Sequence, residues 1–201
     1  GWGGYNAAML EADNSRFIPK TLIPEGILCT PEQPIDWYGH VVCMEPADDQ
    51  TLHFQFPAPG DPTLHMMWSD TPCWTTCWNC GNKYMEALLS PSMEFILVQH
   101  PWFENDCRFA DIVLPVDSSP GMFCTVIKSD KCVEPFGESK SDWFTVQEIA
   151  KKLEELYGNE ERYANIFERY TGGRTVESSI ESMYKASGME KFKSYEQWLE
   201  D

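Results

Sequence analysis

The sequence predicts an α/β fold, a three-layer sandwich built on a mostly parallel, Rossmann-like sheet. Between residues 64 and 116, short apolar runs alternate with helical segments, which is the order of parallel strands joined by helical crossovers. One run, Glu94–Gln99 (EFILVQ), is almost continuously apolar, as expected of a strand buried on both faces. The 201 residues suffice for one sizeable domain or two small ones.

Residues 1–63 are predicted to be a loop-rich N-terminal segment that covers the same domain. Prolines recur throughout it and interrupt any long helix or strand. Thr21–Leu28 (TLIPEGIL) and Asp36–Val42 (DWYGHVV) are expected to form short strands or turns. We therefore do not expect this segment to fold as a domain of its own.

Residues 64–158 are predicted to form the α/β core. The expected elements are a strand at 64–68, a helix at 82–90, a strand at 94–99, one or two helical turns at 104–110 and a strand at 111–116. Asp111 is expected to begin the last strand or to cap a turn. Because parallel strands end at the same edge of a sheet, polar residues after them are candidates for a ligand site.

A long helix is predicted after this sheet, and a helical tail after the helix. Ser141 or Asp142 suits its N-cap, and Gly158 suits its C-terminal stop. Between them, apolar residues recur at helical spacing: Val146, Ile149, Ala150, Leu153 and Leu156. The polar tail, residues 159–201, is expected to hold helices around 161–170, 176–186 and 194–199.

The net charge of −17 disfavours nucleic acid and anionic membrane surfaces, whose phosphates would be repelled. No apolar run is long enough to span a membrane, and no signal peptide is visible. Eight cysteines are too few for a disulfide scaffold of this length. We therefore expect reduced thiols and a cytoplasmic, anaerobic setting. An anionic cofactor would be held by backbone N–H groups, helix N-termini and a few chosen side chains.

Three cysteines, Cys73, Cys77 and Cys80, lie in the loop after the first core strand with the spacing C-x3-C-x2-C. This spacing permits an iron–sulfur cluster, and a zinc site is possible with a fourth ligand such as His65 or Cys107. The third interpretation, which we favour, is that the thiols pack within a loop. The predictions therefore assign no metal ligand to this chain.

Two stretches resemble the molybdopterin oxidoreductases, the dimethyl sulfoxide reductase superfamily. Residues 93–116, MEFILVQHPWFENDCRFADIVLPV, are similar to the family's strand, Gln, aromatic and Ala-Asp-Ile-Val-Leu-Pro pattern. Residues 133–153, VEPFGESKSDWFTVQEIAKKL, are similar to its next segment. Together with residues 66–79, MMWSDTPCWTTCWN, the resemblance covers roughly residues 64–156. The segments WSDTPCWTTCWN and VQHPWFEND most resemble those of family members that transfer hydroxyl groups between polyhydroxylated benzenes such as pyrogallol and phloroglucinol.

The resemblance implies an oxidoreductase chain far longer than 201 residues. Its cofactor would be molybdenum, or tungsten, held by two molybdopterin guanine dinucleotides, and this chain would be the third domain, which binds one of the dinucleotides. It also implies a small aromatic substrate and a heterodimer with a smaller subunit that carries [4Fe–4S] clusters. No catalytic acid or base can be named from this sequence.

The resemblance also implies a set of cofactor-binding residues. The loop after the first strand, which contacts the guanosine or its diphosphate in the family, corresponds to Ser69, Asp70 and Thr71, with Thr71 standing where relatives have Asn. The end of the next strand corresponds to Gln99 and His100, with His100 where relatives have Asp.

Asp142 completes the cofactor-binding set, and Trp2 is the candidate substrate-binding residue. Asp142 would accept hydrogen bonds from guanine N1–H and N2–H, although it equally suits a helix N-cap. Trp2 lies where relatives have a glycine-rich loop near the metal, so it would line an aromatic substrate pocket or simply pack. The alternative function from another class is a stand-alone, Cys-rich metal-binding or interaction module.

Overall fold

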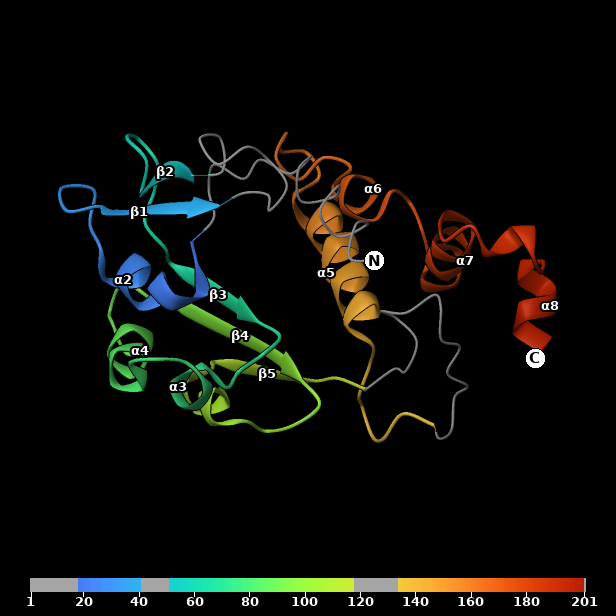
Figure 1. The fold of residues 1–201 in the computed structure, drawn as a ribbon, viewed down its shortest axis with the longest axis horizontal. Coiled ribbons are helices and arrows are strands. Elements are labelled where there is room, and N and C mark those ends of the chain that lie inside the picture. The colour runs from blue at the N-terminus through green and yellow to red at the C-terminus, as the bar shows by residue number, and fades with distance from the viewer. Residues whose placement is uncertain (1–17, 41–50, 118–133, 201) are drawn as a thin grey trace. The chain divides into compact units, whose positions relative to one another are not determined.

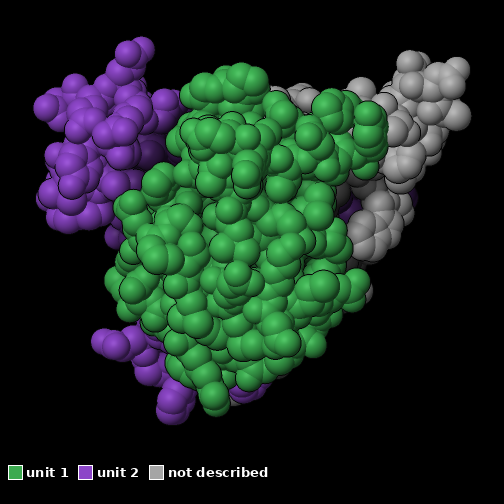
Figure 2. All heavy atoms as spheres, turned by 90° about the vertical axis from the view of Figure 1, so that its left-hand side faces the viewer, with its two compact units in different colours: residues 1–98, 103–113 green, residues 99–102, 114–201 purple. Residues whose placement is uncertain are grey.

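The computed structural model describes residues 18–40, 51–117 and 134–200 (Figure 1). The chain divides into two compact units, which are considered one at a time. Unit 1 comprises residues 1–98 and 103–113, and unit 2 comprises residues 99–102 and 114–201 (Figure 2). The predicted boundaries at 63/64 and 158/159 stay predictions. Among the described residues, no helix is both long and apolar enough to cross a lipid bilayer.

The sheet of the predicted core has three parallel strands in the order β3-β4-β5. They are β3 (Met66–Ser69), β4 (Phe95–His100) and β5 (Ile112–Pro115), and they lie side by side in Figure 1. The pairing of β3 with β4 runs from Met66 opposite Phe95 to Ser69 opposite Val98. The predicted α/β class is therefore confirmed, and each strand lies within two residues of its expected position.

The core of unit 1 lies between β4 and the helices that connect the strands. These helices are α3 (Trp74–Cys77) and α4 (Gly81–Leu88) before β4, and the 3-10 helix η3 (Asn105–Phe109) after it. Buried Leu88 of α4 and Cys107 of η3 pack with Ile96 and Val98 of β4. Residues 96–99 of β4 are all buried, as its apolar run predicts.

Asp111 joins β4 and β5 by two hydrogen bonds. Its N–H donates to the carbonyl oxygen of Ile96 at 2.9 Å, and its carboxylate accepts from the N–H of Ile96 at 2.8 Å. Asp111 therefore lies directly before β5 and binds the neighbouring strand, in agreement with its expected role at a strand start.

The N-terminal part contains more regular structure than the sequence suggested. The expected strand or turn at 21–28 is wrong, because these residues form the 3-10 helix η2 (Lys20–Leu22) and helix α2 (Ile23–Leu28). Pro24 stands at the start of α2, where no N–H is required, so it initiates the helix instead of interrupting it. The antiparallel ribbon of β1 (Ile35–His40) and β2 (Thr51–Phe56) follows.

Helix α2 packs against α4 and is fixed by polar contacts. Tyr84 of α4 is fully buried and donates its hydroxyl to the carbonyl oxygen of Lys20. Lys83 pairs with Glu25 at 2.6 Å. These contacts attach the N-terminal part to the core of unit 1.

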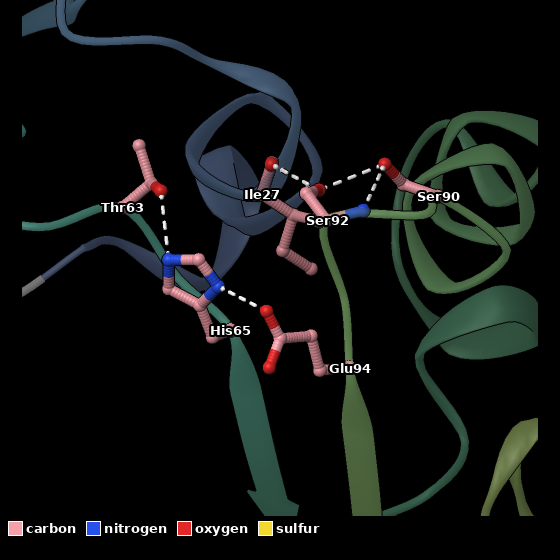
Figure 3. Close-up of polar contacts among 6 residues, drawn as sticks. All are labelled: Ile27, Thr63, His65, Ser90, Ser92 and Glu94. Atoms are coloured by element: carbon pink, nitrogen blue, oxygen red, sulfur yellow. Dashed lines mark hydrogen bonds and ion pairs between the residues drawn. The ribbon is translucent and has the colours of Figure 1, made fainter.

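The opposite ends of β3 and β4, away from the predicted site, are also joined by polar groups (Figure 3). His65 accepts the N–H of Glu94 at its carbonyl oxygen, and its ring lies 3.0 Å from the Glu94 carboxylate and 3.3 Å from the Thr63 hydroxyl. Ser92 reaches the carbonyl oxygen of Ile27 at 3.4 Å and the Ser90 hydroxyl at 2.8 Å. This end of the sheet is therefore occupied by structural contacts.

Unit 2 contains the predicted helix and the helical tail. Helix α5 (Asp142–Tyr157) has Ser141 as its N-cap, whose hydroxyl accepts the N–H of Phe144 at 3.2 Å, and Gly158 as its C-cap. The remaining helices are α6 (Ile166–Thr171), α7 (Val176–Ala186), the 3-10 helix η4 (Met189–Lys191) and α8 (Tyr195–Glu200). The predicted helical C-terminal part is confirmed.

Candidate functional site

The loop after β3 begins with a turn built by its own side chains. Ser69 is only 2% exposed, and its hydroxyl accepts the N–H of Thr71 at 3.3 Å. Thr71 donates its hydroxyl to the Asp70 carboxylate at 2.7 Å, and both side chains are exposed. Asp70 and Thr71 are therefore accessible to a ligand, whereas Ser69 shapes the turn.

A buried carboxylate that the sequence did not single out holds the next part of this loop. Asp106 of η3 is 2% exposed, and its carboxylate accepts the N–H of Trp74 at 2.6 Å and that of Thr75 at 3.2 Å. It also accepts the Thr75 hydroxyl, and its own N–H donates to the carbonyl oxygen of Pro72 at 3.0 Å. Asp106 thereby joins η3 to the start of α3.

The backbone N–H groups of this loop donate hydrogen bonds to acceptors within unit 1. Pro72 has none, and the N–H of Cys73 donates to the carbonyl oxygen of Thr71 at 2.8 Å. Those of Thr71, Trp74 and Thr75 are used in the contacts above. The N–H groups of residues 71–75 are therefore engaged in hydrogen bonds within the loop and with Asp106.

The cysteine loop does not gather its three thiols. Among the described residues, no group of three His, Cys, Asp or Glu side chains has the geometry to hold a metal ion. Burial, the neighbouring Cys77 thiol and the carboxylates of Glu104 and Asp106 raise the pKa of Cys73 to about 11. Cys77 and Cys80 are exposed, so the expectation that all three thiols are packing residues is wrong for these two.

In unit 2, the structure brings together two of the predicted site residues. The Gln99 side chain is buried at the end of β4, and its amide donates to the Asp142 carboxylate at 2.6 Å. Because Ser141 is the N-cap, the Asp142 carboxylate lies in the first turn of α5 and is not required as the cap. A parallel bridge between Val116 and Lys140 aligns the segment before α5 with the end of β5.

His100 and Trp2 are the two predicted site residues that remain. The carbonyl oxygen of His100 accepts the N–H of Val116 at 3.4 Å, and the residue is half-buried. Trp2 lies outside the described residues. A role in cofactor binding stays a prediction for the other six residues, and a role in substrate binding stays a prediction for Trp2.

No protein-family model matches the chain, but three curated relatives do. It is 26% identical to the pyrogallol hydroxytransferase large subunit of Pelobacter acidigallici over 94% of this chain. It is 31% identical to the respiratory nitrate reductase subunit alpha of Haloferax mediterranei over 38% of this chain, and 34% identical to the probable oxidoreductase YjgC of Bacillus subtilis over 30%. All three relatives belong to the molybdopterin oxidoreductase family, so the chain is similar to members of that family.

The three relatives are much longer than this chain. The chain spans 22% of the Pelobacter relative, 8% of the Haloferax relative and 7% of the Bacillus relative. The match to the Pelobacter protein nevertheless runs through most of this chain. The resemblance read from residues 64–156 therefore extends to both compact units.

Proposed function

We propose that this chain is the part of a molybdenum enzyme's large subunit that binds one of two molybdopterin guanine dinucleotides. We further propose that the whole enzyme transfers hydroxyl groups between polyhydroxylated benzenes, as in the conversion of pyrogallol to phloroglucinol. Similarity to members of the molybdopterin oxidoreductase family supports the first statement. The name of the Pelobacter relative and its match over 94% of this chain support the second.

The observation that carries the dinucleotide assignment is the contact between Gln99 and Asp142. Guanine presents two adjacent donors, N1–H and N2–H, and a carboxylate is the side chain that accepts both. The hydrogen bond from Gln99 holds the Asp142 carboxylate at the start of α5, and a carboxylate has about four lone-pair sites. This placement of a carboxylate supports the proposed guanine contact.

The remaining predicted residues are proposed to contact other parts of the nucleotide, and each is considered within its own unit. The exposed Asp70 and Thr71 offer a carboxylate and a hydroxyl to ribose hydroxyl groups. His100 can donate or accept one hydrogen bond, but it cannot clamp two ribose hydroxyls as a carboxylate can. The ribose contact would thus differ from that of relatives with Asp at the position of His100.

The bound cofactor would supply the metal chemistry, and this chain would position it. Further parts of the proposal are a smaller iron–sulfur partner subunit, a cytoplasmic location and molybdenum or tungsten as the metal. Trp2 is proposed to line the aromatic substrate pocket.

The test is the content of the full-length protein that includes this chain. Molybdenum and tungsten would be measured by mass spectrometry, and guanine nucleotide by chromatography after acid hydrolysis. We expect two guanine nucleotides for each metal ion. Zinc or iron in equal amount to the protein, without pterin, would instead support the Cys-rich metal-binding module.

A variant pair assigns the guanine contact to Asp142. Asp142→Asn replaces one acceptor oxygen by a donor, so we expect the variant to lose guanine nucleotide from one of the two positions. The matched control is Glu148→Gln, which removes the same charge from an exposed ion pair with Lys151 on the same helix. Equal nucleotide content in the two variants would show that Asp142 does not hold the base.

A further inference from the structure

The loop after β3 is held by an internal carboxylate at the place where an anionic ligand is usually bound. In nucleotide-binding loops of α/β proteins, backbone N–H groups after a strand contact the phosphates. Here the carboxylate of Asp106 takes the N–H groups of Trp74 and Thr75, at 2.6 and 3.2 Å, together with the Thr75 hydroxyl. The donors at the start of α3 are therefore already paired with a negative charge.

The negative charges of the loop also disfavour a bound diphosphate. Asp106 is buried and Asp70 is exposed, and each brings a carboxylate to the same short segment of unit 1. A diphosphate would have to approach these carboxylates without N–H donors from residues 71–75, which are used inside the loop. A nucleoside carries no charge, and its hydroxyl groups can donate to Asp70 and Thr71.

We infer that Asp106 is a positioning residue that shapes the loop after β3 to contact the nucleoside of the bound dinucleotide and not its diphosphate. This inference rests on the proposed function. Asp106 touches no ligand in this scheme. It acts through the backbone of Trp74 and Thr75, and through the bond from its own N–H to Pro72, which directly follows Thr71.

The test is the binding of two probes, guanosine and inorganic pyrophosphate, to full-length protein produced without cofactor. Calorimetric titrations would compare the unchanged protein with Asp106→Asn. We expect Asp106→Asn to weaken guanosine binding roughly tenfold, because leaving buried donors unpaired has an effect of this size. Pyrophosphate binding is expected to change by less than about twofold.

Asp111→Asn is the matched control. Asp111 is also a carboxylate that accepts a backbone N–H in unit 1, but it binds Ile96 between β4 and β5 and makes no contact with the loop. Its binding of both probes is expected to match that of the unchanged protein. A general loosening of unit 1 would weaken both probes in both variants, whereas a positioning role weakens guanosine in Asp106→Asn alone.

A second variant keeps the test decisive if Asp106→Asn does not fold, as circular dichroism would reveal. Thr75→Val removes one donor to Asp106 and leaves the carboxylate in place. We expect it to weaken guanosine binding about threefold and to leave pyrophosphate binding unchanged. Guanosine binding that is unchanged in the folded variants, or pyrophosphate binding that weakens equally, overturns the inference. If the unchanged protein binds neither probe and carries no guanine nucleotide when isolated, the proposed function itself fails, and the inference with it.

Discussion

Cys73 provides a prediction that does not depend on the proposed cofactor. Burial, the largest cause, and the hydrogen bond and charge of Cys77 raise the pKa of the Cys73 thiol from 9.0 to about 11, with smaller effects from Glu104 and Asp106. At pH 8 a thiol with this pKa is about 0.1% thiolate, compared with about 9% for an unshifted thiol. Because the thiolate is the reactive form, we expect Cys73 to react with iodoacetamide about a hundredfold more slowly than an unshifted thiol.

The assay follows the alkylation rate of the Cys73 peptide by mass spectrometry from pH 7 to 11. Cys77→Ser removes the hydrogen bond and charge of the second thiol, so the inflection is expected to move below 11 while staying above 9.0, since burial remains. Cys80→Ser is the control, because Cys80 is not among the groups that shift Cys73. An inflection at or below pH 9 in the unchanged protein would refute the reasoning and return the thiolate to consideration as a metal ligand.

Three further predictions concern the stability of unit 1. Tyr84→Phe leaves the carbonyl oxygen of Lys20 without its buried donor, so hydrogen exchange is expected to show α4 opening more easily by about 1–2 kcal/mol. Gly81→Ala would place a Cβ against the carbonyl oxygen of Thr75, and the resulting shift is expected to destabilise α4 by about 1–3 kcal/mol in the same measurement; an unchanged exchange rate would contradict the close approach. Because the pKa of Cys73 is raised on folding, its contribution to stability is complete below pH 9 and lost as the pH rises towards 11; a melting temperature that is constant over this interval would contradict it.

Several elements were predictable because local and tertiary preferences agree. The apolar run of β4 predicts burial on both faces, and residues 96–99 are buried. Helix α5 combines helical periodicity with a suitable residue at each end, and it runs between Ser141 and Gly158. Helix α2 was missed because Pro24 was taken as an interruption, whereas at the start of a helix its missing N–H has no consequence.

The candidate site was only partly predictable. Gln99 and Asp142 each follow from their place at the end of a strand and the start of a helix, but the bond between them joins residues 43 positions apart. Asp106 gave no sequence signal, because its partners Trp74 and Thr75 lie 32 and 31 positions earlier. A single Asp in a polar segment is usually solvated, and only the folded chain reveals that this one is buried.

The two hydrogen bonds between Asp111 and Ile96 limit how the sequences of related proteins can vary between β4 and β5. A slip of β5 by one residue would break both hydrogen bonds, leave the N–H of Ile96 in the buried strand unpaired and turn each side chain of β5 to the other face. Any change in the connection must therefore keep Asp111 beside Ile96. In an alignment of homologous sequences, insertions and deletions are expected to fall in the connections and not within β4 or between Asp111 and β5.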